Sequence, residues 1–172
     1  QWAHASTLDL THWQHHPFAI QITEEWEGSI CTGSTLYSDG AYYCFYTTRM
    51  PDRSAQPLGV AISADGIHFE KQPHLGFLAP PYDPRPARDP CVFRDEETGG
   101  FHMLVTTELQ DPMVDGRGGC LAHLVSTDLL YWEQKEPFLI PGYTDQPECC
   151  DYFAWHGWYY LIFSNYGIAR YR

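Results

Sequence analysis

The sequence predicts an all-β fold of the propeller type, and three observations support this. A turn-like fragment occurs three times, apolar runs are short and rich in aromatic and β-branched residues, and helical periodicity is nearly absent. The copies of the fragment span 6–13, 63–69 and 126–132, so their aromatic ends are 56 (13 to 69) and 63 (69 to 132) residues apart. A repeat of this length with four short strands matches one propeller blade.

Each expected strand is bounded by turn residues such as Ser38-Asp39-Gly40 and His156-Gly157. The first strand of a unit is expected to be innermost, and a hairpin leads to an aromatic second strand. The repeated fragment is expected to form the turn between the third and fourth strands. The expected strands are 33–37, 90–93 and 151–154 as first strands, 41–47, 100–105 and 158–163 as second, 58–63 and 119–125 as third, and strands opening on Trp13, Phe69 and Trp132 as fourth.

These elements amount to the end of one blade, two whole blades and the first half of another. About three blades cannot close a ring, because propellers have four to eight. The chain opens at Gln1 without a methionine and stops at Tyr171-Arg172 in a strand-like run. We therefore expect residues 1–172 to be a fragment of one propeller domain in a longer gene product.

The charge distribution limits the partners. The formal net charge is −12 and the only lysines are Lys71 and Lys135, so binding to nucleic acid is not expected. No run reaches the ~18 apolar residues of a membrane span, so no membrane partner is expected. One interpretation of this charge is an acidic surface that keeps the protein soluble. An acidic cleft lined by aromatic residues would instead suit a neutral sugar.

The six cysteines are expected to be reduced core residues. Cys149 and Cys150 are adjacent, so in a strand they would point to opposite faces, and no C-x-x-C pair suggests zinc. No metal and no cofactor are expected, and the clustered His12, His15 and His16 are interpreted as part of an exposed turn. Reduced cysteines favour a cytoplasmic location, but no targeting signal decides the compartment.

Two carboxylates stand at the predicted starts of neighbouring innermost strands. Asp89 lies in an Arg-Asp-Pro segment, and Glu148 follows it by 59 residues, about one blade period. The two should therefore occupy equivalent places and face one cavity at the hub. One carboxyl of such a pair stays protonated and can act as a general acid. The alternative interpretation is an Asp that caps a turn and a solvated Glu.

Six segments form an ordered set of motifs: 2–6 (WAHAS), 9–13 (DLTHW), 25–28 (EWEG), 31–34 (CTGS), 88–90 (RDP) and 148–151 (ECCD). Together they resemble glycoside hydrolase family 32, which includes invertases, inulinases and levanases. The resemblance covers nearly the whole chain, and it implies an incomplete five-bladed β-propeller as the catalytic domain.

The resemblance also implies roles for individual residues. Glu148 would be the general acid/base and Asp89 the transition-state stabiliser that holds fructosyl hydroxyls. Arg88 would bind the ring and keep Asp89 ionised. The remaining residues implied to line the sugar subsite are Trp2, Trp26 and Thr32. The implied reaction is the retaining, two-carboxylate cleavage of terminal fructosyl residues from sucrose or fructans.

The sequence departs from the family pattern in one important respect. The family nucleophile is an Asp in an N-D-P motif, and the only asparagine here is Asn165, so no such motif is present. We expect the 172 residues alone to be inactive. Further departures occur at Ala3, Cys31, Thr32 and Cys150, and they bear on substrate preference. Hydrolysis versus fructosyl transfer and the oligomeric state stay open.

Two other functions remain possible. One is an inverting propeller glycosidase acting on arabinan or xylan, whose carboxylates stand roughly 6.5–9.5 Å apart rather than the roughly 5–5.5 Å of retaining enzymes. The other is a non-catalytic carbohydrate-binding propeller, which would keep the aromatic subsite and lack the nucleophile.

Overall fold

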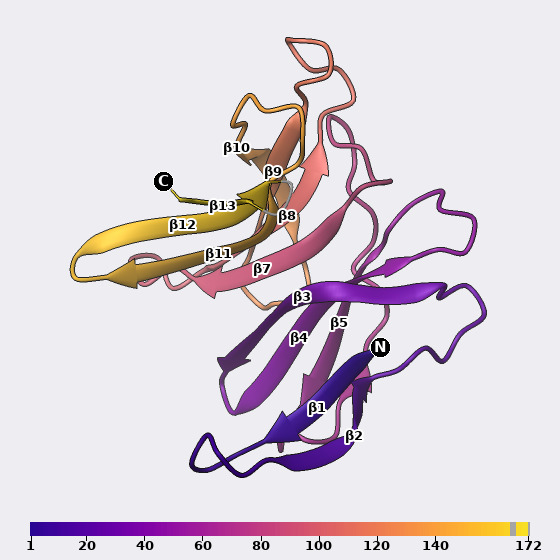
Figure 1. Cartoon of the computed structure of the whole chain (residues 1–172), viewed down its shortest axis with the longest axis vertical. Coiled ribbons are helices and arrows are strands. Elements are labelled where there is room, and N and C mark those ends of the chain that lie inside the picture. Colours follow the sequence, from indigo (N-terminus) through magenta and orange to yellow (C-terminus); the bar gives the residue numbers. More distant parts are fainter. Residues whose placement is uncertain (166–167, 172) are drawn as a thin grey trace.

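The computed structural model describes residues 1–165 and 168–171, and these residues form strands and loops without a helix. The all-β prediction is confirmed. No helix in this part of the chain could therefore cross a membrane. Thirteen strands form four antiparallel sheets in chain order, as Figure 1 shows.

Each sheet is one blade or part of one. The first holds β1 (Trp2–Ser6) and β2 (Gln14–Ile20). The second holds β3 (Ser29–Ser38), β4 (Ala41–Arg49), β5 (Leu58–Ser63) and β6 (Glu70–Lys71). The third holds β7 (Arg88–Arg94), β8 (Phe101–Glu108), β9 (Gly119–Ser126) and β10 (Glu133–Leu139). The fourth holds β11 (Glu148–Trp155), β12 (Trp158–Asn165) and β13 (Ile168–Tyr171).

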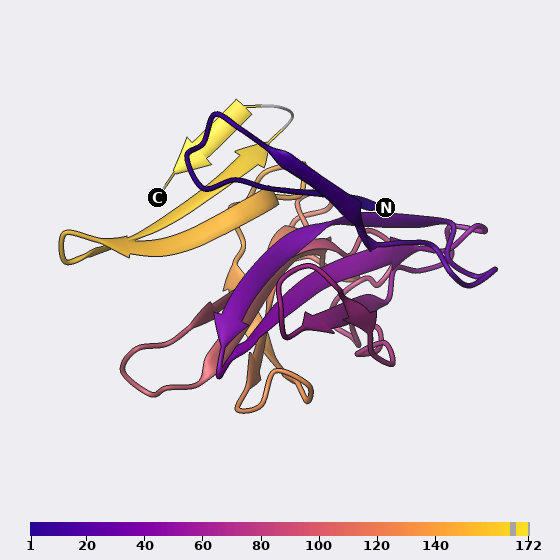
Figure 2. The same cartoon turned by 90° about the horizontal axis from the view of Figure 1, so that it is seen from below.

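The first strands of the three larger sheets lie next to one another. β7 lies between β3 and β11, and the later strands of each sheet follow outward from them (Figure 1). The β1–β2 hairpin lies beside the β3–β6 sheet (Figure 2). The final sheet has three strands where the sequence predicted the first half of a blade. The first strands also begin earlier than predicted, at 29, 88 and 148 rather than 33, 90 and 151.

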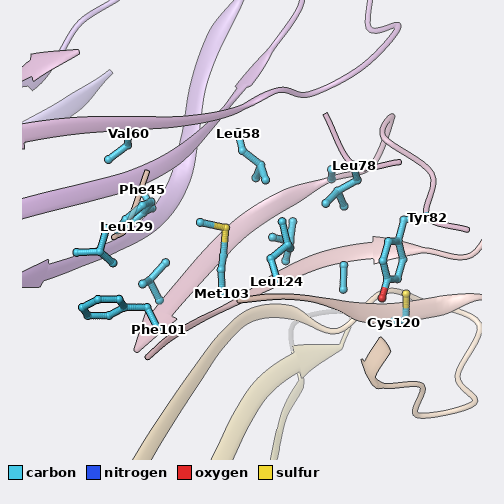
Figure 3. Packing of buried hydrophobic residues seen from close by; sticks show 14 residues of the cluster. Phe45, Leu58, Val60, Leu78, Tyr82, Phe101, Met103, Cys120, Leu124 and Leu129 are labelled. Atoms are coloured by element: carbon cyan, nitrogen blue, oxygen red, sulfur yellow. The ribbon is translucent and has the colours of Figure 1, made fainter. Parts of the chain in front are cut away.

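Alternating residues of the strands pack the sheets against one another. Met103 on β8 belongs to the cluster shared with the β3–β6 sheet, whereas its neighbour Leu104 belongs to the cluster shared with the β11–β13 sheet. Figure 3 shows Met103 and Leu124 opposite Phe45 and Leu58 in the first of these clusters. Each buried side chain of this size stabilises the fold by roughly 1.5–3 kcal/mol. Apolar packing between blades therefore holds the inner strands in place.

The repeated fragment forms the turn between third and fourth strands, as predicted. Asp65 Oδ1 accepts hydrogen bonds from the amides of Ile67 and His68, both at 2.8 Å. In the other two copies of the turn, Oδ1 of Asp128 and Oδ1 of Asp9 each accept hydrogen bonds from the amides two and three residues later in the chain. His68 contacts Asp65 at 2.7 Å, so the histidine of this turn is exposed and paired within it. The same contact joins the first-turn histidine to its aspartate.

The cysteines are free thiols, and four of them are buried in the blade interfaces. Cys91 on β7 and Cys150 on β11 interact through their thiols, and both residues lie close to the starts of their strands. Burial raises the pKa of Cys120 to about 12, which keeps this thiol neutral. The prediction of small apolar core residues is confirmed for the buried four. It was wrong for Cys149, which is exposed, and Cys31 is only half-buried.

Candidate active site

A β-bulge lies near the start of each inner strand. On β7, Arg88 and Cys91 are three residues apart, whereas their partners on β8, Thr106 and Leu104, are only two residues apart. β7 therefore carries one extra residue at this point. β11 has the same irregularity between Glu148 and Asp151, and β3 has it between Ile30 and Gly33. On β7 and β11, the residue that follows the first residue of the bulge has a left-handed backbone conformation. The φ values are 53° at Asp89 and 47° at Cys149.

The bulges establish which residues are equivalent between blades. Arg88 pairs with Thr106 across its sheet, and Glu148 pairs with Ser164 in the same way. Glu148 is therefore the counterpart of Arg88, and Cys149 is the counterpart of Asp89. The expectation that Asp89 and Glu148 are equivalent was wrong by one residue. Each carboxylate nevertheless contacts the neighbouring strand, because Glu148 pairs with Arg88 on β7 and Asp89 accepts from the Cys149 amide on β11.

Arg88 joins the two strands by an ion pair. Its Nη2 lies 2.6 Å from Oε1 of Glu148, and its Nε lies 3.1 Å from the same oxygen. Its Nε is also 3.8 Å from Oδ2 of Asp89. The Glu148 side chain is 40% exposed and that of Arg88 18%, so the acid remains accessible while the guanidinium is largely covered.

Asp89 is the buried member of the pair. It is 6% exposed, and its Oδ1 accepts a short hydrogen bond from the Thr32 hydroxyl on β3. Its Oδ2 accepts from the backbone amide of Cys149 at 3.2 Å and contacts the thiol of that residue at 3.6 Å. Burial and the charge of Asp89 raise the pKa of the Cys149 thiol. Three inner strands thus converge on one carboxylate.

Two further residues support Arg88, and the sequence analysis missed them. Arg88 Nη2 donates to Oε1 of Gln146 at 3.1 Å, and Nε2 of Gln146 donates to Oε2 of Glu108 at 2.8 Å. Arg88 Nη1 donates to the carbonyl of Pro86 at 2.8 Å. Glu108 ends β8, so only the sheet arrangement reveals its link to a residue 38 positions later. No local motif in the sequence signals this chain of contacts.

The two predicted tryptophans lie in different places. Trp2 donates through Nε1 to the Cys31 carbonyl at 2.8 Å, which sets it beside Thr32. Trp26 packs edge-on against His74, with ring centroids 6.1 Å apart. It lines a cavity of about 420 Å³ whose walls include neither Arg88, Asp89 nor Glu148. The structure therefore gathers Glu148, Asp89, Arg88 and Thr32, with Trp2 adjacent, and leaves Trp26 apart.

The sheets form part of a β-propeller, whose inner strands bring Glu148, Asp89 and Arg88 together. The chain belongs to glycoside hydrolase family 32: the model of the "Glycosyl hydrolases family 32 N-terminal domain" matches residues 1–170. This agrees with the resemblance of its motifs.

Curated relatives and solved structures agree with this membership. A sucrose-6-phosphate hydrolase of Escherichia coli is 31% identical over 177 residues, covering 97% of this chain and 35% of that protein. A raffinose invertase of Escherichia coli is 28% identical with the same coverages. The chain thus spans about a third of the length of these relatives. The fold matches fructan 1-exohydrolase IIa of Cichorium intybus with a TM-score of 0.82 at 20% identity, over 98% of this chain and 35% of that one.

Proposed function

We propose that the protein carrying this chain cleaves terminal fructosyl residues from sucrose or fructans. The observation that carries the proposal is the cluster of Glu148, Arg88 and Asp89 at the bulged starts of two adjacent inner strands. Names of family members such as sucrose-6-phosphate hydrolase and raffinose invertase support a fructoside as substrate. Residues 1–172 would form part of one propeller catalytic domain.

Each site residue has a role in this proposal. Glu148 is exposed enough to reach a leaving-group oxygen. In its protonated form it would give its proton to that oxygen, and the carboxylate so formed, paired with Arg88, would take a proton from the attacking water. Asp89 is held by Thr32 and the Cys149 amide, so it would remain fixed while it binds sugar hydroxyls. Arg88 would position the pair, and Trp2, which lies beside Thr32, would contact the sugar.

The proposed retaining reaction also needs a carboxylate nucleophile. No N-D-P motif occurs in the 172 residues. We therefore place the nucleophile in a segment of the natural protein outside this sequence, and we expect the chain by itself to be inactive. The chain's coverage of only 35% of its relative supports this assignment.

The test is an assay of the complete natural protein on sucrose, inulin and levan. Glu148→Gln should lower the rate of fructose release about 10²–10⁴-fold, because the general acid is lost. Glu133→Gln is the matched control, since this carboxylate is exposed on β10 and pairs with Lys135. Full activity of Glu148→Gln would refute the assignment. Product of inverted anomeric configuration would favour the arabinan or xylan type, and a lack of turnover with retained sugar binding would favour the non-catalytic type.

A further inference from the structure

We propose a second, non-catalytic sugar-binding site in the cleft between the β7–β10 and β11–β13 sheets. A cavity of about 320 Å³ opens there, within the usual size range of small-molecule sites. Residues of two neighbouring blades, the β7–β10 sheet and the β11–β13 sheet, line this cavity. The residues that argue for a ligand are Phe93, Phe138, Tyr152, Tyr159, Arg94 and Asp95.

The cavity lies far from the candidate active site. β7 begins at Arg88 and ends at Arg94, which lines the cavity. A strand rises about 3.3 Å per residue, so the two sites are separated by roughly 20 Å along β7. In Figure 1 the β7–β8 and β11–β12 hairpins extend to the same side, at the opposite end of β7 and β11 from Arg88 and Glu148. The proposal therefore goes beyond the fructosidase function and uses none of its residues.

Aromatic rings form one wall of the cavity. Phe93 contacts Tyr152 with ring centroids 4.2 Å apart and ring planes tilted by 30°, and Tyr152 lies parallel to Tyr159 at 5.9 Å and 8°. Phe138 meets Tyr152 edge-on at 6.0 Å. Tyr159 is nevertheless 61% exposed and Phe138 39% exposed. The inner rings thus hold two outer rings in place, with apolar surface left free for a C–H face of a ligand.

Polar groups of both signs form the rest of the lining. Arg94 and His102 can donate hydrogen bonds, and Asp95, Glu96 and Glu97 can accept them. Asp95 is itself held by the Glu97 amide at 2.9 Å and the Thr98 hydroxyl at 2.5 Å, so the acidic turn has a defined shape. Sugar hydroxyls both donate and accept, which suits this mixture. An organic cation would suit the cavity less well, because the positively charged guanidinium of Arg94 would repel it.

Isothermal titration of the complete natural protein with the trisaccharide 1-kestose tests the site. The Glu148→Gln background prevents turnover during the measurement. We expect two binding equivalents, of which one weakens about two- to tenfold in Tyr159→Ala, since one lost aromatic contact is worth about that range. Trp158→Ala is the matched control, because this neighbour is 71% exposed and does not line the cavity. Circular dichroism checks that both variants fold.

The outcomes separate this proposal from the first. Unchanged binding in both Tyr159→Ala and Phe138→Ala would overturn the second site. Tetramethylammonium binding that Tyr159→Ala abolishes, without any sugar binding, would also overturn it in favour of a cation site. Sucrose hydrolysis in Tyr159→Ala with Glu148 intact should stay unchanged. If the fructosidase function is wrong, one sugar equivalent should remain, and Tyr159→Ala should remove it.

Discussion

Arg88 and Glu148 occupy matching positions on neighbouring inner strands, and Nη2 of Arg88 lies 2.6 Å from Oε1 of Glu148. The same place in the repeat thus carries opposite charges on adjacent blades. Because the guanidinium also bonds to Gln146 and Pro86, its plane is fixed before any sugar binds. The predictions below follow from this pair and from the strands that hold it.

Replacing Arg88 by lysine should impair activity although the charge is kept. A lysine ammonium cannot bond to Glu148, Gln146 and the Pro86 carbonyl in the fixed geometry of a guanidinium. We expect kcat/KM for sucrose to fall about 10–100-fold, measured as fructose release by the complete protein. Arg53→Lys in an exposed loop is the control. Equal kinetics of the two variants would contradict a positioning role for Arg88.

Glu108 should act on the site only through Gln146. Glu108→Ala removes the acceptor of the Gln146 amide, so kcat should fall about 5–10-fold, as expected for one lost hydrogen bond. Glu108→Gln keeps an acceptor oxygen and should restore most of the rate. Equal losses of activity in both variants would show that the hydrogen bond between Glu108 and Gln146 only supports the structure and does not position Arg88. Steady-state kinetics with sucrose distinguish these results.

Thr32→Val should destabilise the protein by leaving Asp89 short of a donor. The substitution keeps the shape and removes the hydroxyl that bonds to this buried carboxylate. We expect the free energy of unfolding to fall by about 1.5–3 kcal/mol in urea titrations. Thr127→Val, at an exposed turn position, should change it little. Equal losses in the two variants would show that the Thr32 hydroxyl has no special role.

Gly33 should not tolerate a side chain. A Cβ at this position would lie 1.9 Å from the carbonyl oxygen of Phe45, an approach that only backbone movement could relieve. Gly33→Ala should lower the free energy of unfolding by more than about 2 kcal/mol. Gly100→Ala is a suitable control because its Cβ would meet nothing closer than 3.5 Å. Thermal unfolding of both variants would reveal the difference, and equal melting temperatures would argue against the close approach.

Glu27 should make stability depend on acidic pH. Burial favours its neutral form, but the Lys71 ammonium at 2.6 Å and the amides of Thr23 and Glu24 hold the pKa of this carboxyl below its usual value. A lowered pKa stabilises the fold above the unfolded value of about 4.3, and this contribution is lost as pH falls through the lower folded value.

The comparison with Glu27→Gln measures that contribution. The difference in unfolding free energy between wild type and this variant should be constant near pH 7 and should shrink below about pH 4.3. The exposed neighbour Glu25 provides the control, and Glu25→Gln should show little such dependence. A difference that grows on acidification would have the wrong sign for this ion pair.

The blade pattern could be predicted from the sequence, because the interactions that produce it are local. The repeated turn forms through bonds from Asp65 or Asp128 to amides two and three residues later, so a short fragment specifies it. Strand alternation is equally local, as at Met103 and Leu104. The motifs around Arg88 and Glu148 also led to the family.

The contacts between blades could not be predicted in this way, because they depend on how the folded sheets pack. Ladder pairing across β7–β8 and β11–β12 places the bulges, and the bulges make Arg88, not Asp89, the counterpart of Glu148. The link from Glu108 to Gln146 joins the end of β8 to the loop before β11, so no nearby sequence spacing encodes it. The ring contact between Trp26 and His74 likewise joins residues that are far apart in the sequence. Contacts between distant segments depend on how whole sheets pack, and that packing is a sum over many side chains rather than a property of one motif.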